Sequence, residues 1–178
     1  MMFVSLGIGT VLAVALISVV SLLTGGKVTD QSGQPTSALV GQHVKAFTLS
    51  GLGTTTQRAP WALGHASVLI FFASWCTPCQ EELPRVAAYL ARHPTGSVAV
   101  LGMDSNDQRA AAQQFVKKMG VKFPVAFDAN GTVTSTVFGF GQLPETVFVN
   151  AQGIVTTVHF GAIDTKSLAR GISALRAA

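Results

Sequence analysis

The sequence predicts an α/β sandwich in which helices flank a central mixed sheet and a membrane helix precedes the domain. Three observations predict this fold class. Continuous apolar runs alternate with segments of helical spacing, as expected of buried strands that are each followed by a helix. The C-terminal part reads as a hairpin and a closing helix. Residues 1–26 carry no charged side chain, which is typical of a hydrophobic leader.

Residues 1–26 are predicted to be a membrane anchor or signal-anchor. The apolar stretch from Phe3 to Leu23 reaches the ~20 residues that a helix needs to span a bilayer. A cleaved signal peptide normally has an early Lys or Arg and a shorter apolar core, so we favour an uncleaved anchor over a cleaved signal. Lys27 is the only Lys or Arg near this stretch, and it specifies the orientation weakly.

Residues 27–40 are predicted to be a flexible tether. This segment is rich in Ser, Thr, Gly, Gln and Pro and lacks a hydrophobic period. Residues 41–178 are assigned to one folded domain, which is long enough to bury a single sizeable core.

The first elements of the domain are expected to be two strands and a helix. Residues 43–52 alternate enough for a first strand, and residues 53–60 read as a turn-rich connection. Residues 67–74 form a continuous run of β-branched and aromatic side chains, which is typical of a strand buried on both faces. Residues 77–93 then change to helical spacing. Pro84 is expected to kink this helix because it removes a backbone donor.

The remaining elements continue the alternation of strand and helix. Apolar runs predict strands, a Gly after a periodic segment predicts a helix end, and a turn motif between two strands predicts a hairpin. The expected elements are a strand at 97–103, a capped helix at 107–120, a strand at 123–128, two strands within 145–161 joined by a turn at 150–153, and an amphipathic helix at 165–177.

The basic side chains do not predict a nucleic-acid partner. The formal net charge is +4, but the 12 Lys and Arg residues are scattered along the chain. Proteins that follow a nucleic-acid backbone need a dense basic run or interleaved aromatic side chains. We therefore expect no nucleic acid among the partners.

The only two cysteines, Cys76 and Cys79, stand where the buried strand gives way to a helix. A helix N-terminus presents free N–H groups and partial positive charge, which lower the pKa of a thiol placed there. Cys76 is thus the expected nucleophile, and Cys79, about one turn further, is the expected resolving thiol. Pro78 lies near the first helical turn, where its missing N–H costs little.

Other uses of the two cysteines remain open but are less favoured. A structural zinc site would need two further ligands, and the four histidines are scattered without metal-type spacing. A structural disulfide across so short a loop would stabilise little. A copper-binding chaperone module, with His159 as an added ligand, is the alternative of another class. We expect no cofactor and no metal.

The segments WCTPCQEELP and FGQLPETVFVNAQGIV resemble those of membrane-anchored, extracytoplasmic thioredoxin-like proteins. The group is the TlpA/ResA group, and the resemblance is closest to its CcmG (DsbE) thiol-disulfide interchange type. It extends from about Gly41 to the C-terminus. The implied fold is a thioredoxin-like sandwich. The implied location is the cell membrane, with a single pass and the domain on the periplasmic or extracellular side.

The resemblance implies a thiol-disulfide oxidoreductase with a redox-active Cys-Thr-Pro-Cys pair. Its implied task is to reduce protein disulfides in cytochrome c maturation, with apocytochrome c as a substrate and a membrane protein as reductant. A disulfide-forming oxidase of secreted proteins is the alternative, because the direction depends on a reduction potential that the sequence does not give.

The resemblance also assigns roles to residues outside the cysteine pair. Pro144 would be the cis-proline beside Cys76, with the backbone of Leu143 pairing with the extended substrate chain; an ordinary turn proline is the alternative. Trp75 would be a partly exposed platform rather than a core side chain. Glu82 and Glu145 would tune the thiols or move protons.

Simpler readings of the two acids stay open, since Glu82 could be a solvated charge on a helix face and Glu145 a loop charge. The sequence also departs from thioredoxins at Ile70, where they keep a buried acid six residues before the first cysteine.

Overall fold

The computed structural model describes residues 37–139 and 141–178. The predicted anchor at 1–26 and the tether up to residue 36 lie outside these residues. Within the described ranges, no helix is long and apolar enough to cross a membrane. The compact unit begins at Ser37, and Gly41 N–H donates to Val155 O at 2.8 Å, which attaches the start of the domain to the sheet.

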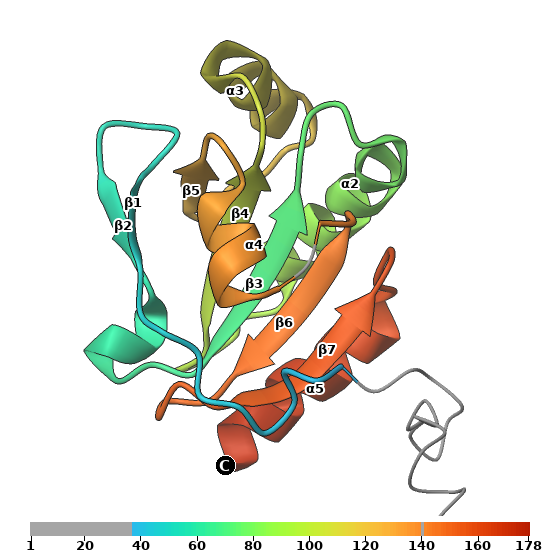
Figure 1. Cartoon of the computed structure of the whole chain (residues 1–178). Helices are drawn as coiled ribbons and strands as arrows, with labels where there is room; N and C mark the ends of the chain where they lie inside the picture. Colours follow the sequence, from blue (N-terminus) through green and yellow to red (C-terminus); the bar gives the residue numbers. More distant parts are fainter. Residues whose placement is uncertain (1–36, 140) are drawn as a thin grey trace, which may run out of the picture. The chain divides into compact units, whose positions relative to one another are not determined.

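The centre of the domain is a mixed five-stranded sheet in the order β5-β4-β3-β6-β7 (Figure 1). β3 is parallel to β4 and β4 to β5, whereas β6 is antiparallel to both β3 and β7. Every residue of β3 is buried, as predicted from its continuous apolar run. The strands are β3 (Ser67–Phe72), β4 (Ala99–Ser105), β5 (Val125–Asp128), β6 (Glu145–Val149) and β7 (Val155–Phe160).

Two hydrophobic clusters cover the two faces of this sheet. Side chains of β3 alternate between them: Ile70 and Phe72 join one cluster, and Phe71 joins the other. The first cluster takes side chains from α2 (Thr77–Arg92), α3 (Arg109–Lys118) and α5 (Thr165–Ala177). The second takes side chains from residues 44–61 and from the end of α4 (Thr132–Val137). The predicted thioredoxin-like sandwich of a mixed sheet and flanking helices is confirmed.

Two parts of the fold differ from the sequence prediction. Residues 53–60 are more than a connection, because β1 (Thr48–Ser50) and β2 (Thr56–Arg58) form a two-stranded antiparallel sheet, followed by the 3-10 helix η1 (Pro60–Leu63). Strands of three residues are too short to show a period. Helix α4 was not predicted either, and it begins where Thr134 N–H and Oγ1 donate to Asp128 Oδ2 at 2.8 and 2.9 Å.

The other predicted helices are present with small changes at their ends. α2 continues through Pro84. α3 begins after Gln108, which makes no side-chain cap. α5 matches the predicted range of 165–177, and the Asp164 carboxylate caps it by accepting Ser167 N–H at 2.8 Å. α5 passes close over β6 at Gly171, where a Cβ would overlap the ring of Phe148.

Candidate active site

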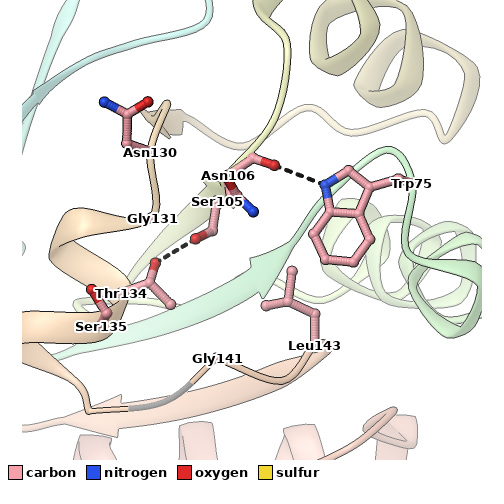
Figure 2. Close-up of a pocket in the computed structure, with 9 residues that line it drawn as sticks. All are labelled: Trp75, Ser105, Asn106, Asn130, Gly131, Thr134, Ser135, Gly141 and Leu143. Carbon is pink, nitrogen blue, oxygen red and sulfur yellow. Dashed lines mark hydrogen bonds between the residues drawn. The ribbon is translucent and has the colours of Figure 1, made fainter.

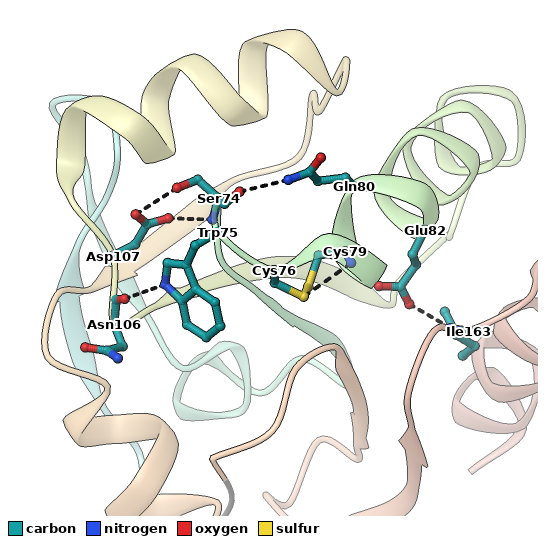
Figure 3. Close-up of a disulfide and its surroundings, with 9 residues drawn as sticks. All are labelled: Ser74, Trp75, Cys76, Cys79, Gln80, Glu82, Asn106, Asp107 and Ile163. Carbon is teal, nitrogen blue, oxygen red and sulfur yellow. Dashed lines mark hydrogen bonds between the residues drawn. A yellow bond between two sulfur atoms is a disulfide. The ribbon is translucent and has the colours of Figure 1, made fainter.

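Cys76 and Cys79 form a disulfide at the start of α2 (Figure 3). Cys76 is the N-cap residue, and its Sγ accepts the Cys79 backbone N–H at 3.2 Å. Cys79 is fully buried, and Cys76 is 4% exposed. The Cα atoms are 5.3 Å apart, as one helical turn requires. β3 thus delivers the pair to a helix N-terminus, where backbone N–H groups stabilise negative charge on sulfur.

The loop before Cys76 is fixed by the Asp107 carboxylate (Figure 3). Its Oδ2 accepts Ser74 N–H at 2.6 Å and its Oδ1 accepts Ser74 Oγ at 2.9 Å. Gln80 Nε2 on α2 donates to Ser74 O at 3.3 Å, so the loop is held from both sides. The sequence placed Asp107 only at the start of a helix. Its part in the site depends on a contact between distant segments.

Trp75 is 55% exposed, so its expected position as a partly exposed platform next to Cys76 agrees with the structure. Its indole Nε1–H donates to Asn106 O at 2.8 Å. Asn106 has a φ of 53°, in the left-handed region that Asn tolerates better than most side chains. The unusual backbone of Asn106 thus presents its carbonyl to the indole and fixes the ring.

The Leu143–Pro144 peptide bond is cis, as the resemblance implied. Pro144 directly precedes β6, and β6 begins with Glu145 opposite Phe71 near the end of β3. The cis-proline and Cys76 therefore lie at the same end of the two neighbouring strands. The backbone of Leu143 makes no hydrogen bond with any of the described residues. It is available to pair with an extended chain.

Glu82 is fully buried, so the reading of a solvated helix-face charge is wrong. It lies one turn after Cys79 on the same side of α2. Its Oε1 accepts Ile163 N–H at 2.7 Å, whereas its Oε2 has no partner among the described residues. Burial raises the pKa of Glu82 to about 7, although the Ile163 hydrogen bond and the Arg85 charge act in the opposite direction.

Glu145 is also buried, at 3% exposure, so it is not a loop charge. It is the first residue of β6, between Phe71 of β3 and Phe160 of β7. Its Oε2 has no partner in the described part of the chain. Burial raises the pKa of Glu145 to about 7. Both acids proposed from the resemblance therefore titrate near neutral pH.

Asp104 is a third buried acid, which sequence reasoning missed. It lies on β4 opposite Phe72. Phe72 is the last residue of β3, the strand that leads to Cys76. It is fully buried, and its carboxyl group lies beside that of Asp107. Burial and then the Asp107 charge raise the pKa of Asp104 to about 8. β3 has Ile70 where thioredoxins have an acid, but the neighbouring strand supplies one.

Replacing Asp104 with Asn is expected to weaken the dependence of stability on pH. The raised pKa means that between about pH 4 and 8 the folded state holds a proton that the unfolded state has lost. The contribution of Asp104 to the free energy of unfolding is therefore fully present at acid pH. It is lost as pH rises towards 8, by at most about 1.4 kcal/mol per pH unit. Urea unfolding of the oxidised protein at pH 5, 6, 7 and 8 measures the slope.

The matched control is Glu81→Gln, which removes an exposed carboxylate on α2. It should leave the slope as in the wild type. Equal slopes for wild type and Asp104→Asn would mean that Asp104 is ionised throughout this range. The pKa values of Glu82 and Glu145 are raised as well, so part of the slope between about pH 5 and 7 should remain in the variant.

The histidines contribute no metal site in the described part of the chain. Among residues 37–139 and 141–178, no three His, Cys, Asp or Glu side chains form a group that could hold a metal ion. His159 is half-buried, and its Nε2 lies 3.3 Å from Ala162 O. Among these residues, no His, Asp or Glu side chain therefore forms such a group with the two cysteines, as the copper-chaperone alternative expected of His159.

Comparison with known proteins places this geometry in a family. Residues 40–158 match the AhpC/TSA family. A curated relative, the thiol-disulfide oxidoreductase ResA of Halalkalibacterium halodurans, is 25% identical over 126 residues, which are 71% of either chain.

Two solved structures are similar over nearly their whole length. DsbF of Mycobacterium tuberculosis, solved in mixed oxidised and reduced forms, is 34% identical with a TM-score of 0.65, over 79% of this chain and 98% of that one. A putative thiol:disulfide interchange protein DsbE from Chlorobium tepidum is 26% identical with a TM-score of 0.68, over 78% and 99%. The chain belongs to the AhpC/TSA family and is a thioredoxin-like protein of the TlpA/ResA/CcmG type.

Proposed function

We propose that this thiol-disulfide oxidoreductase reduces protein disulfides through Cys76 and Cys79. The observation that carries the proposal is the disulfide at the N-cap of α2. Two features beside it suit a protein substrate: the exposed ring of Trp75, and the backbone of Leu143 before a cis-proline, which pairs with none of the described residues. An extended chain can pair with that backbone and present its sulfur to Cys76.

In the reduced protein, the Cys76 thiolate attacks one sulfur of the substrate disulfide. A bond forms between Cys76 Sγ and that sulfur, the substrate disulfide breaks, and the other substrate sulfur leaves as a thiolate. The Cys79 thiolate then attacks Cys76 Sγ, which restores the disulfide seen here and releases the second substrate thiolate. Two electrons pass to the substrate. A separate dithiol reductant must return the pair to the reduced state.

The second step requires Cys79 to lose its proton inside the core. Cys79 is fully buried, so water is a poor acceptor at this position. Glu82, one turn further along α2, has an Oε2 with no partner in the described ranges, and burial raises its pKa to about 7. A carboxylate with such a pKa can accept a proton at neutral pH. We assign this role to Glu82. Glu145, the first residue of β6, is a second buried acid at the same end of the sheet as Cys76.

Replacing Glu82 with Gln is expected to lower the pKa of the Cys76 thiol by about half a unit to one unit. The ionised carboxylate disfavours a second negative charge nearby, so its removal favours the thiolate. The rate of Cys76 alkylation as a function of pH measures this pKa. Glu81→Gln is the control, because it removes an exposed charge one residue away. An unchanged or raised thiol pKa in Glu82→Gln would contradict the tuning role.

We propose that electrons flow from the protein to its substrate. Thr77 and Pro78 add no charge that would stabilise a thiolate, and the buried acids oppose one. Less thiolate stabilisation makes the couple more reducing, towards the potential of thioredoxin near −270 mV rather than that of DsbA near −120 mV. Equilibrium with a glutathione buffer measures the potential. A value near −120 mV, with rapid oxidation of reduced unfolded proteins, would support the oxidase alternative.

We further propose that the protein acts outside the cytoplasm, tethered to the cell membrane by residues 1–26, in cytochrome c maturation. The apolar leader supports the location, and the motifs shared with the CcmG type support the pathway. Membrane fractionation and labelling of intact cells with an impermeant thiol reagent test the location. Loss of haem-containing c-type cytochromes in a deletion strain, restored by the wild type but not by Cys76→Ser, tests the pathway.

A further inference from the structure

A cavity of about 200 Å³ opens beside Trp75, the residue before Cys76, on the side of Asn106 and α4 (Figure 2). Its volume is below the ~300–1,000 Å³ typical of small-molecule sites, so it suits a single side chain. None of the lining residues is charged. They are Trp75, Ser105, Asn106, Asn130, Gly131, Thr134, Ser135, Gly141 and Leu143.

Two walls of the cavity are also parts of the redox site. The Leu143 side chain points towards the indole of Trp75 across the mouth (Figure 2). Trp75 directly precedes Cys76, and Leu143 directly precedes the cis-proline. A chain that pairs with Leu143 and reaches Cys76 therefore passes this mouth. A side chain next to its reacting cysteine can enter.

The polar groups of the cavity fall into two sets. The hydroxyl groups donate to other groups of the protein: Ser105 Oγ to Thr134 Oγ1 at 2.7 Å, and Ser135 Oγ to Thr132 O at 3.2 Å. The carboxamides of Asn106 and Asn130 are exposed and make no hydrogen bond with other described residues. They are left to donate to, and accept from, a ligand.

We propose that this cavity is a specificity site for an uncharged, hydrogen-bonding side chain of the substrate, such as an amide or a hydroxyl. The inference rests on the proposed function. The Trp75 and Leu143 walls contact the carbon atoms of the incoming side chain, and Asn106 and Asn130 pair with its polar end. A charged side chain would lose hydration without finding an opposite charge, so it binds less well.

Disulfide-bonded peptides that differ only in the residue beside the reacting cysteine test the proposal. The reduced full-length protein is given peptides with Asn, Asp or Lys at that position, and kcat/KM for their reduction is measured. The Asn peptide should react about threefold faster than either charged peptide. Asn130→Asp should raise the Lys-to-Asn ratio of kcat/KM, and Asn130→Lys should raise the Asp-to-Asn ratio, each by about threefold.

Gln152→Asp and Gln152→Lys are the matched controls. Gln152 is an exposed amide in the turn after β6, at the opposite end of the sheet from Cys76. Equal rates for the three peptides, or ratios that Gln152 variants shift as much as Asn130 variants, would overturn the specificity site. Hydroxyethyl disulfide has no peptide backbone that could pair with Leu143 and direct a side chain into the cavity. If the wild type reduces neither this compound nor the peptides, the proposed function itself fails.

Discussion

Replacing Cys76 with Ser is expected to abolish disulfide reduction, and replacing Cys79 with Ser is expected to trap the substrate on the protein. Cys76 caps α2 and receives the Cys79 N–H, so it is the sulfur whose thiolate the helix stabilises. Without the Cys76 sulfur, kcat/KM should fall by at least about a thousandfold, because the remaining sulfur belongs to Cys79, which is fully buried. Reduction of a protein disulfide, followed by thiol quantification, measures the loss.

The trapped species separates the roles of the two cysteines. In Cys79→Ser, no second thiol attacks Cys76 Sγ, so a mixed disulfide with the substrate accumulates and is visible on a non-reducing gel. The wild type should show no lasting adduct, because Cys79 releases the substrate. A stable adduct on Cys79 in the Cys76→Ser protein would reverse the assignment of nucleophile and resolving thiol.

Replacing Gly171 with Ala is expected to destabilise the oxidised protein by about 1–3 kcal/mol. Alanine normally stabilises a helix interior relative to glycine, by roughly 0.5–1 kcal/mol. Here the added Cβ would overlap the ring of Phe148, which is 1% exposed on β6. Either α5 or the ring must move, and overpacking of this kind costs more than the helix gains. Urea unfolding at pH 7 measures the difference.

Two further variants identify the cause. Ser173→Ala changes an exposed position of the same helix, so it should be neutral or slightly stabilising. Combining Gly171→Ala with Phe148→Leu should cost less than the sum of the two single changes, because the smaller side chain leaves room for the Cβ. Stability of Gly171→Ala equal to that of the wild type would show that the contact relaxes without cost.

The sequence predicted the local parts of the fold better than the contacts between distant parts. The apolar run before Cys76 predicted β3, and the change to helical spacing predicted α2, because both patterns lie within one segment. The burial of Glu82 was not predictable in this way. Its partner, Ile163 N–H, comes from the loop before α5, and only the packing of α5 beside α2 brings the two together.

Asp104 shows the same limit for a strand. The prediction ended this strand at Met103, since an acid rarely continues an apolar run. β4 instead continues to Ser105, and its pairing with β3 places Asp104 opposite Phe72 inside the protein. Helix α4 was missed because its sequence, TVTSTV, is rich in residues that favour strands. Hydrogen bonds to Asp128 on β5 outweigh that preference.

The antiparallel pairing of β3 with β6 has a consequence for the protein while it is being made. Synthesis runs from the N-terminal end, so Cys76 and Cys79 leave the ribosome well before Glu145–Val149 exist. Until β6 docks beside β3, the two thiols lack the cis-proline segment and the buried Glu145. During that interval a substrate chain has no Leu143 backbone to pair with beside Cys76. The newborn chain therefore acquires its substrate-pairing backbone only after Glu145–Val149 have been made and have docked beside β3.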